Sequence, residues 1–449
     1  MSKPSIPKGT RDFQPLILAK RKFILKTIEI VYQAYGFMEI QTPSMENLST
    51  LTGKYGSEGD QLLFKIVNSG DYLSGIDIEN ENSKSLLPKI SEKGLRYDLT
   101  VPLARYVVMN QNDISFPFKR YQMQPVWRAD RPQKNRYREF WQCDADVLGT
   151  KSMLCEADFI AIYQEVFKKL GINEFQIKLN HRKLLEATIE KAGQSNNFKE
   201  ITIIIDKKDK IGEDGVKKEL QVLGLSDDSI SIIFSLLKIN SFDADFLNHL
   251  KTVFSESNLG MEAIKDLETI LSLIGTTNNN VVIDCSLARG LDYYTGCIFE
   301  VAPTNVSMGS ISGGGRYDNL TAMFGLNGVS GVGISFGLDR IYDLMEELNL
   351  FSAQKFNFTN ILFCPMDENT IIYCNEIANS LRQKDFNVEV YPSAAKLNKQ
   401  LDYANKKQIE WVAIVGENEY KSSSVMLKNM ETGTQELIEK HDLLIKNLG

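Results

Sequence analysis

The chain has 449 residues, of which 43% are hydrophobic and 24% charged, so we expect about two or three globular domains. Its net charge of −7 argues against unselective nucleic-acid binding, although not against a local basic patch. Six cysteines without a CxxC and three histidines provide neither zinc-ligand spacing nor a plausible disulfide framework, so we expect no metal site. Because no signal-like or membrane-length apolar run occurs, we expect an intracellular, cytoplasmic protein.

The N-terminal part of the chain alternates helical and extended patterns. Residues 14–35 carry apolar side chains at helical spacing, and 37–42 is predicted as a strand that Pro43 ends. Residues 69–94, rich in Asn, Ser, Glu and Gly, are predicted as a long mobile loop. Apolar runs on either side predict strands at 62–67 and 95–99 and a helix at 101–109.

Residues 119–149 are predicted to form two strands joined by a basic loop, with polar side chains at every second position. One face of the pair would carry Arg120, Gln122, Gln124, Arg128, Arg138, Phe140, Gln142, Asp144 and Asp146. This alternation predicts one packed face and one open face. Arg, Gln, Phe and Asp together could hold an anion, an aromatic ring and a cation, but an ordinary solvated antiparallel face is the alternative.

In the remainder of the first domain the predicted secondary structure changes twice. A helix is predicted at 154–170 and a strand at 175–179, and 184–276 is mostly amphipathic helix that we interpret as an insertion. Strand character returns at 281, 298–301 and 332–336, before a helix at 337–347 and a linker at 350–360.

Residues 361–449 alternate short strands and helices, which predicts a separate α/β domain with a largely parallel sheet. The predicted elements are strands at 361–364, 387–391, 411–415 and 425–429 and helices at 369–383, 395–407 and 439–447.

Three further stretches are rich in residues that bind ligands. In LRYDLTVPLAR, Asp98 could bind an ammonium group, although a helix N-cap fits Asp98 or Thr100 equally well. LARGLDYYTG combines the anion binder Arg289 with two phenols, and a tyrosine-rich core turn is the alternative. SGGGRYDNL and GVGISFGLDR match neither a dinucleotide nor a P-loop pattern, and Arg340 could cover a base or form a surface salt bridge.

In this order the stretches resemble the histidyl-tRNA synthetases, a family of class II aminoacyl-tRNA synthetases. GTRDF and the helix after it resemble the start of the family and motif 1 (about 15–43), 119–149 resembles motif 2, and 331–347 resembles motif 3. LARGLDYYTG and GGGRYDNL resemble the two histidine signatures. The resemblance implies an α+β fold: an antiparallel-sheet catalytic domain (1–349) with a helical insertion, a C-terminal α/β anticodon-binding domain (361–449), and a homodimer through motif 1.

The resemblance also implies a reaction and its residues. L-Histidine would be ligated to its tRNA through histidyl-adenylate, with ATP as substrate and Mg²⁺ arriving with it. The catalytic residues would be Arg128 and Arg289. The histidine-binding residues would be Asp98, Leu99, Thr100, Arg128, Gln142, Asp146, Arg289, Tyr293, Tyr294 and Tyr317. ATP would contact Arg128, Phe140, Arg138, Arg289 and Arg340. The acceptor end of the tRNA would meet Arg131, Gln133, Lys134 and Arg136. Lys396, Lys399, Lys406 and Lys407 would contact phosphates on the anticodon side, or simply form a solvated helix face.

Two departures and two alternatives accompany this interpretation. Asp98-Leu99-Thr100 is one of two variants that the family uses, and Asp130 replaces a glutamate common in class II enzymes, which puts an ATP-contacting role for it in doubt. A regulatory, non-catalytic relative would usually lack the anticodon domain and erode LARGLDYYTG, and both are intact. A synthetase for another amino acid would have to explain the three tyrosines together.

Overall fold

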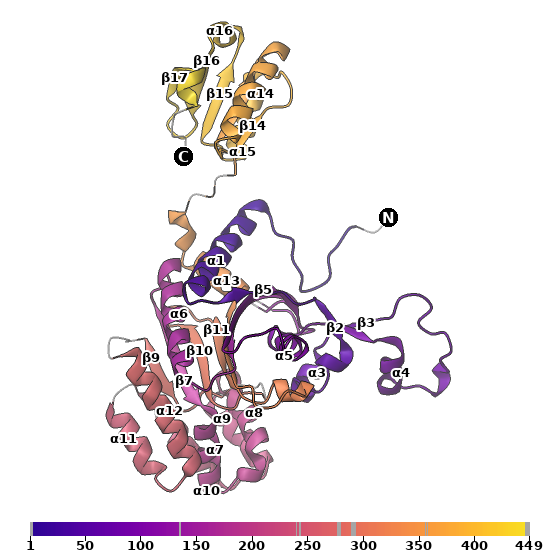
Figure 1. Cartoon of the computed structure of the whole chain (residues 1–449), viewed down its shortest axis with the longest axis vertical. Helices are drawn as coiled ribbons and strands as arrows, with labels where there is room; N and C mark the ends of the chain where they lie inside the picture. The colour runs from indigo at the N-terminus through magenta and orange to yellow at the C-terminus, as the bar shows by residue number, and fades with distance from the viewer. Residues whose placement is uncertain are drawn as a thin grey trace. The chain divides into compact units, whose positions relative to one another are not determined.

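The computed structural model divides into two compact units, Met1–Phe351 and Ser352–Gly449 (Figure 1). The residues that it describes are 3–133, 136–238, 240–241, 244–275, 280–288, 293–354, 356 and 358–444. Within these ranges, no helix has the length and apolar character to cross a membrane.

A nine-stranded sheet forms the centre of the first unit, in the order β1-β5-β6-β12-β11-β10-β7-β9-β8. The pairs β1–β5 and β7–β9 are parallel, and the other neighbours are antiparallel. The strands are β1 (Met38–Glu39), β5 (Phe118–Trp127), β6 (Glu139–Leu148), β7 (Phe175–His181), β8 (Asn240–Ser241), β9 (Val281–Asp284), β10 (Cys297–Pro303), β11 (Ser312–Tyr317) and β12 (Gly331–Gly337).

One face of this sheet is covered by α1 (Pro15–Ala34), α6 (Leu154–Leu170) and α13 (Leu338–Glu347). The Tyr32 hydroxyl of α1 donates to the Cys143 carbonyl of β6 at 2.8 Å. The rings of Tyr163 on α6 and Phe336 on β12 meet edge to face, 5.3 Å apart. The prediction of a helix over 154–170 is therefore confirmed, and its apolar side packs on the sheet.

The polar face of the β5–β6 hairpin is covered around Arg120 and Gln122, which corrects the prediction of an open face there, whereas Arg128, Phe140 and Gln142 line a cavity. Helix α5 (Thr100–Met109) lies in the hollow of the curved sheet (Figure 1). Its Leu103 and Val107 pack with Phe118 and Leu148. The side chain of Arg120 is consequently 0% exposed. Tertiary packing against a helix, which strand periodicity does not reveal, buries this part of the polar face.

Residues 69–94 are not the long mobile loop that their composition predicts. Helix α4 begins after Asn82, whose side chain accepts from the backbone N–H groups of Lys84 and Ser85 and forms a capping box with Ser85. The stretch also ends in a strand of a three-stranded sheet, ordered β2-β4-β3. The elements of this region are β2 (Met45–Asn47), α2 (Leu48–Leu51), α3 (Gly56–Gln61), β3 (Lys65–Ile66), η1 (Ile78–Asn80), α4 (Ser83–Ile90) and β4 (Lys93–Leu95).

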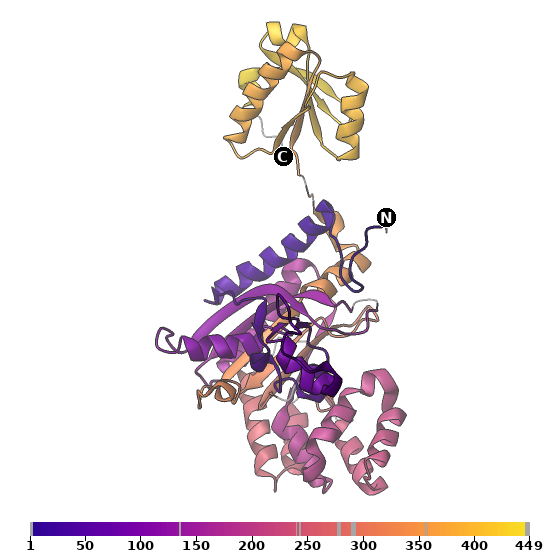
Figure 2. The ribbon, with the colours of Figure 1, turned by 90° about the vertical axis from the view of Figure 1, so that its right-hand side faces the viewer.

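Between β7 and β9 the chain forms a layer of helices beside the sheet, which Figures 1 and 2 show at one end of the first unit. They are α7 (Arg182–Lys191), α8 (Phe198–Asp206), α9 (Lys208–Val222), α10 (Asp227–Leu237), α11 (Ala244–Val253) and α12 (Asn258–Ile274), and the short 3₁₀ turn η2 (Ser195–Asn197) lies between α7 and α8. Further 3₁₀ turns later in the chain are η3 (Thr321–Phe324) and η4 (Leu350–Ala353). Their buried Leu185, Ile201 and Ile233 belong to the same apolar cluster as Tyr294 and Tyr317. The helical layer thus supports the sheet beneath the two tyrosines.

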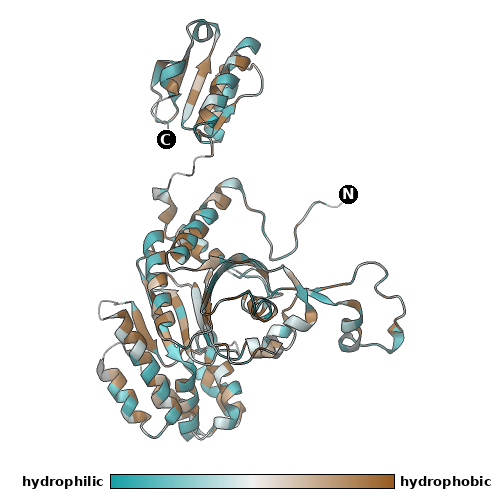
Figure 3. Cartoon of the chain, viewed as in Figure 1, coloured by the Kyte–Doolittle hydropathy of each residue, from teal (hydrophilic) through white to brown (hydrophobic). Residues whose placement is uncertain are grey.

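The second unit has a five-stranded sheet in the order β14-β13-β15-β16-β17, and its central strand β15 is hydrophobic (Figure 3). Its first three strands are parallel and its last two antiparallel, so the sheet is mixed. The last predicted helix, at 439–447, is present as the short α17, and strand β17 directly before it was not predicted. The elements are β13 (Ile361–Pro365), α14 (Glu368–Arg382), β14 (Val388–Val390), α15 (Leu397–Lys406), β15 (Trp411–Val415), α16 (Glu417–Lys421), β16 (Ser424–Asn429), β17 (Gln435–Glu439) and α17 (Lys440–Leu443).

Candidate active site

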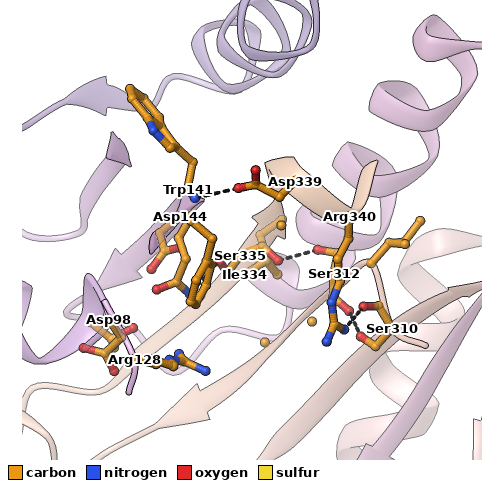
Figure 4. A pocket seen from close by; sticks show the side chains of 18 of the residues that line it. Asp98, Arg128, Trp141, Asp144, Ser310, Ser312, Ile334, Ser335, Asp339 and Arg340 are labelled. Atoms are coloured by element: carbon orange, nitrogen blue, oxygen red, sulfur yellow. Dashed lines mark hydrogen bonds between the residues drawn. The ribbon is translucent and has the colours of Figure 1, made fainter. Parts of the chain in front are cut away.

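A cavity of about 300 Å³ lies over the β5–β6 hairpin and its neighbours β12 and β11 (Figure 4). The structure brings together eleven of the predicted site residues here: Asp98, Thr100, Arg128, Arg136, Phe140, Gln142, Asp146, Tyr293, Tyr294, Tyr317 and Arg340. Leu99, Arg131, Gln133 and Arg138 are not among the residues that line it. Arg289 and Lys134 lie outside the described residues.

At one end of the cavity Asp146 is held from two sides. The Tyr317 hydroxyl donates to its Oδ1 at 2.5 Å, and Arg120 Nη2 lies 2.6 Å from its Oδ2. Burial raises the pKa of Asp146, and the charge of Arg120 opposes this shift. A Cβ atom at Gly333 would overlap Asp146, so glycine is required for the carboxylate to lie flat against β12.

Three tyrosines form the wall beside Asp146. The ring centroids of Tyr293 and Tyr294 are 4.8 Å apart, and the ring of Tyr293 meets that of Tyr317 at 84°. A Cβ atom at Gly315 would lie 2.7 Å from the Tyr294 ring, so this glycine makes room for it. Burial raises the pKa values of Tyr293 and Tyr317 well above 10. Both phenols therefore stay protonated at neutral pH and can donate hydrogen bonds to a ligand or to Asp146.

Asp98 and Arg128 lie side by side at another part of the cavity (Figure 4). Asp98 Oδ1 accepts from the Val101 N–H and the Tyr55 hydroxyl, both at 3.1 Å. Its Oδ2 is buried and has no hydrogen-bond partner among the described residues. One oxygen of Asp98 therefore caps the start of α5, as one interpretation predicted, and the binding of an ammonium group by the other oxygen stays a prediction. Burial raises the pKa of this carboxyl.

The guanidinium group of Arg128 is held between aromatic rings. It lies 4.1 Å from the ring centroid of Tyr97 and 5.3 Å from that of Phe140, and its Nε donates to the Tyr97 carbonyl at 3.1 Å. These contacts fix the direction of a permanent positive charge beside the cavity.

Arg340 lies across the cavity from Arg128, in the first turn of α13 (Figure 4). Its Nη1 donates to the Ser310 carbonyl. The preceding residue, Asp339, accepts from the Trp141 N–H at 2.9 Å and pairs with Arg21 and Arg11. Motif 3 is thereby joined to motif 1, to β6 and to the N-terminal segment.

The loop between β5 and β6 is tied down by its own charges. Asp130 lines the cavity, its Oδ1 lies 3.3 Å from Arg136 Nη2, and its carbonyl accepts from Arg138 Nε at 3.0 Å. The Arg138 N–H donates to the Gly9 carbonyl. Asp130 therefore shapes the loop, and Arg138 faces the N-terminal segment.

The sequence interpretation left Asp144 and Ser335 without a role, although both line the cavity. The two-residue period placed Asp144 on the face of Gln142 and Asp146, which was a usable signal. Burial raises the pKa of Asp144 to about 7, against the opposing charge of Arg120. Ser335 accepts from Gln142 Nε2 at 3.1 Å, and no sequence signal marked it.

Comparisons with known proteins agree with this arrangement. A family model for histidyl-tRNA synthetase matches residues 88–341, and an anticodon binding domain model matches 360–446. The histidine–tRNA ligase of Cytophaga hutchinsonii is 51% identical over 440 residues, covering 97% of each chain. That of Bacteroides fragilis is 52% identical over 448 residues, covering 99% of this chain and 98% of its own.

A solved structure of histidyl-tRNA synthetase from Nostoc sp. PCC 7120 is 30% identical, with a TM-score of 0.82 and 99% of both chains covered. A structure from Bacillus halodurans, described as an ATP phosphoribosyltransferase regulatory subunit/histidyl-tRNA synthetase, shares the fold at 19% identity and a TM-score of 0.72. With the catalytic match over more than half of the chain and relatives about half identical from end to end, the chain belongs to the histidyl-tRNA synthetase family.

Proposed function

We propose that the chain is a histidine–tRNA ligase, which joins L-histidine to its tRNA through histidyl-adenylate. The observation that carries this proposal is the arrangement of one cavity: Asp98 offers a buried carboxylate oxygen, Asp146 and Tyr317 form a polar pair, and Arg128 supplies a fixed positive charge. These groups complement the ammonium, imidazole and carboxylate of histidine. The full-length similarity to curated histidine–tRNA ligases supports the same activity.

In the first step, an oxygen of the histidine carboxylate attacks the α-phosphorus of ATP, and the bond to the departing pyrophosphate breaks. The carboxylate is ionised at neutral pH, so it needs no general base. The step instead needs positive charge where the phosphate gathers negative charge, and we assign this to Arg128 and Arg289. ATP would bind against Phe140 and Arg340 and bring Mg²⁺ on its phosphates.

In the second step, the 3′-terminal hydroxyl of the tRNA attacks the activated carbonyl and AMP leaves. Arg131, Gln133, Lys134 and Arg136, in the loop beside the cavity, are the proposed contacts of the acceptor end. In the second unit, Lys407 forms an ion pair with Glu389 at 2.8 Å, which makes it a weaker candidate for phosphate than the exposed Lys396, Lys399 and Lys406. Recognition there would be largely electrostatic and salt-sensitive.

Selection of histidine follows from polar contacts to the imidazole ring. Asp146, Tyr294 and Tyr317 would hydrogen-bond its two nitrogens. A site built around such partners rejects analogues that lack them by roughly 10⁴–10⁵, because buried polar groups would otherwise be left unpaired. This accounts for selection without a second, editing site.

Motif 1 supplies a proposed dimer surface. On α1, Leu16 and Leu18 are each 42% exposed and Ile30 is 47% exposed, and Met38 of β1 is 61% exposed. Exposed apolar residues on α1 and the neighbouring β1 favour a protein contact. Light scattering should therefore give a mass near twice the 50.8 kDa of one chain.

Histidine-dependent exchange of pyrophosphate into ATP tests the proposed function with the purified chain. We expect exchange with histidine alone among the common amino acids, and a rate lower by about 10²–10³ in Arg128→Ala. Absence of exchange with histidine, or equal exchange with another amino acid, would contradict the proposal and favour a regulatory relative or a different synthetase.

A further inference from the structure

Three acceptor oxygens that line the cavity are buried and lack a hydrogen-bond partner among the described residues. They are Asp98 Oδ2, Gln142 Oε1 and Asp144 Oδ1. Asp146 Oδ2 also lacks a hydrogen bond to the described residues, but it forms an ion pair with Arg120 at 2.6 Å, and Asp146 Oδ1 accepts from the Tyr317 hydroxyl. Buried acceptors without partners are costly, so three in one cavity indicate a ligand group that carries several donors and no acceptor.

We propose that Asp144 is a further histidine-recognition residue, which accepts a hydrogen bond from the α-ammonium group beside Asp98 and Gln142. An ammonium group has three N–H donors and no acceptor, which matches the three oxygens in number and kind. Its charge would otherwise be costly to bury. The inference rests on the proposed function, because it assigns one atom of that function's amino-acid substrate.

Local contacts fix the direction of these oxygens. Asp144 lies on β6 between Gln142 and Asp146 and faces Ser335 across the pairing with β12. The Ser335 hydroxyl stabilises the ionised Asp144 side chain and, through its oxygen, accepts from Gln142 Nε2 at 3.1 Å. Because Nε2 is used in this way, the amide oxygen of Gln142 is the atom left for the ligand. One serine thus orients Gln142 and favours the charged form of Asp144.

The position of Asp144 separates it from the imidazole site. Asp146, two residues further along the strand, is already bound to Tyr317. Figure 4 shows Asp144 on the same side of the cavity as Asp98 and Arg128, with Ser310 and Arg340 on the other side. The fields of Asp98 and Asp144 also act together on Tyr293. Asp144 is therefore placed towards the ammonium end of the proposed substrate.

The charge of the site supports the same assignment. The charged and titratable groups that interact electrostatically with Asp144 are Arg120 on β5, Asp146 and Cys143 on β6, Asp98 before α5, Tyr32 on α1, and Arg96 and Tyr293. Arg120 is shared by Asp144 and Asp146, and burial raises the pKa of Asp144 to about 7. A bound cation would lower that pKa, because it favours the charged carboxylate.

The test compares histidine with 3-(imidazol-4-yl)propanoate, which is histidine without its amino group, in pyrophosphate exchange by the full-length protein. In Asp144→Asn we expect the KM for histidine to rise at least tenfold. The inhibition constant of the deaminated analogue and the KM for ATP should stay within about twofold of wild type. Asp158→Asn is the matched control, because it removes one carboxylate charge on α6, where Asp158 pairs with Lys119. We expect it to change none of these constants.

Ser335→Ala provides a second variant that introduces no unpaired charge. It should raise the KM for histidine about threefold to tenfold and spare the analogue, so it decides the matter if Asp144→Asn does not fold. Equal weakening of histidine and the analogue, or no weakening of either, would overturn the role of Asp144 while leaving the proposed function intact. A wild-type protein without histidine-dependent exchange would overturn the proposed function itself.

Discussion

Two buried arginine–carboxylate pairs in the first unit differ in how many N–H groups of the arginine have a hydrogen-bond partner. Arg316 on β11 donates to both carboxylate oxygens of Glu156, at 2.6 and 2.8 Å, and also to Ser330 Oγ and to the carbonyls of Thr150 and Ser152. Arg120 on β5 lies 2.6 Å from Asp146, and the same nitrogen contacts the Leu99 carbonyl at 3.4 Å. Its Nε and Nη1 have no hydrogen-bond partner among the described residues.

We infer from this difference that the Arg316–Glu156 pair stabilises the fold, whereas the Arg120–Asp146 pair takes part in ligand binding in the cavity. A buried donor without a partner costs free energy, so most of a native interior avoids it. Arg316 faces one carboxylate and satisfies it fully. Arg120 faces Asp144 and Asp146, which it cannot neutralise together, directly below the place proposed for histidine. The Arg120–Asp146 pair leaves carboxylate oxygens available to a ligand. The free energy that this costs is offset by fully paired contacts elsewhere in the fold, such as Arg316 with Glu156.

The largest expected effect is on stability, in Glu156→Gln. The change leaves Arg316 as a buried charge without its counter-ion, so the free energy of unfolding should fall by about 3–5 kcal/mol. Urea denaturation measures this loss, and the KM for histidine of the folded variant should stay within twofold. Glu165→Gln is the control on the same helix, because its 3.6 Å pair with Lys169 is exposed and is worth less than about 1 kcal/mol. Similar losses in both variants would remove the distinction between the pairs.

Asp146→Asn should act mainly on catalysis. Loss of a hydrogen bond from a charged group costs about 1.5–3 kcal/mol, so kcat/KM for histidine should fall roughly 10- to 100-fold. The unfolding free energy should fall by less than in Glu156→Gln, because fewer satisfied bonds are broken around Arg120. Steady-state exchange and urea denaturation on the same preparations give both numbers. A stability loss equal to that of Glu156→Gln, with unchanged kinetics, would show that both pairs are structural.

Sequence periodicity predicted those elements that keep one apolar side against the same neighbour along their whole length. The helix at 154–170 was found with its predicted bounds, because its apolar side faces one sheet throughout. Strand β11 was missed, since Ser312 and three glycines lack the side chains that favour strands. Gly314 and Gly315 are needed because the backbone of β12 approaches the first closely and the Tyr294 ring approaches the second, which is a tertiary requirement.

The sequence predicted which types of residue form the site, but not which of their side chains are buried. The resemblance and the two-residue period both led to Asp146, and the period alone marked Asp144. Neither could show that α5 buries Arg120, or that Ser335 orients its neighbours, because these depend on segments far apart in the chain. Arg138 was assigned to ATP from its place in the hairpin, yet its backbone and side chain bind the N-terminal segment and Asp130.

The smallest predicted effect is a pH dependence of the KM for histidine, which the carboxylates around Arg120 should produce and the Arg316–Glu156 pair should not. Because burial outweighs the opposing charge of Arg120, which Asp144 shares with Asp146, the pKa of Asp144 is raised to about 7, and it gains a proton as the pH falls through that value. Its neutral form binds a cation poorly, so the KM for histidine should rise about tenfold between pH 8 and pH 6, in proportion to the lost carboxylate. Free histidine also titrates in this range, but Asp144→Asn experiences the same change in its substrate. The ratio of the two KM values therefore isolates Asp144: it should be largest at pH 8 and shrink towards pH 6. A ratio that is constant with pH would mean that Asp144 keeps one protonation state, and that Arg120 neutralises its neighbours as completely as Arg316 does.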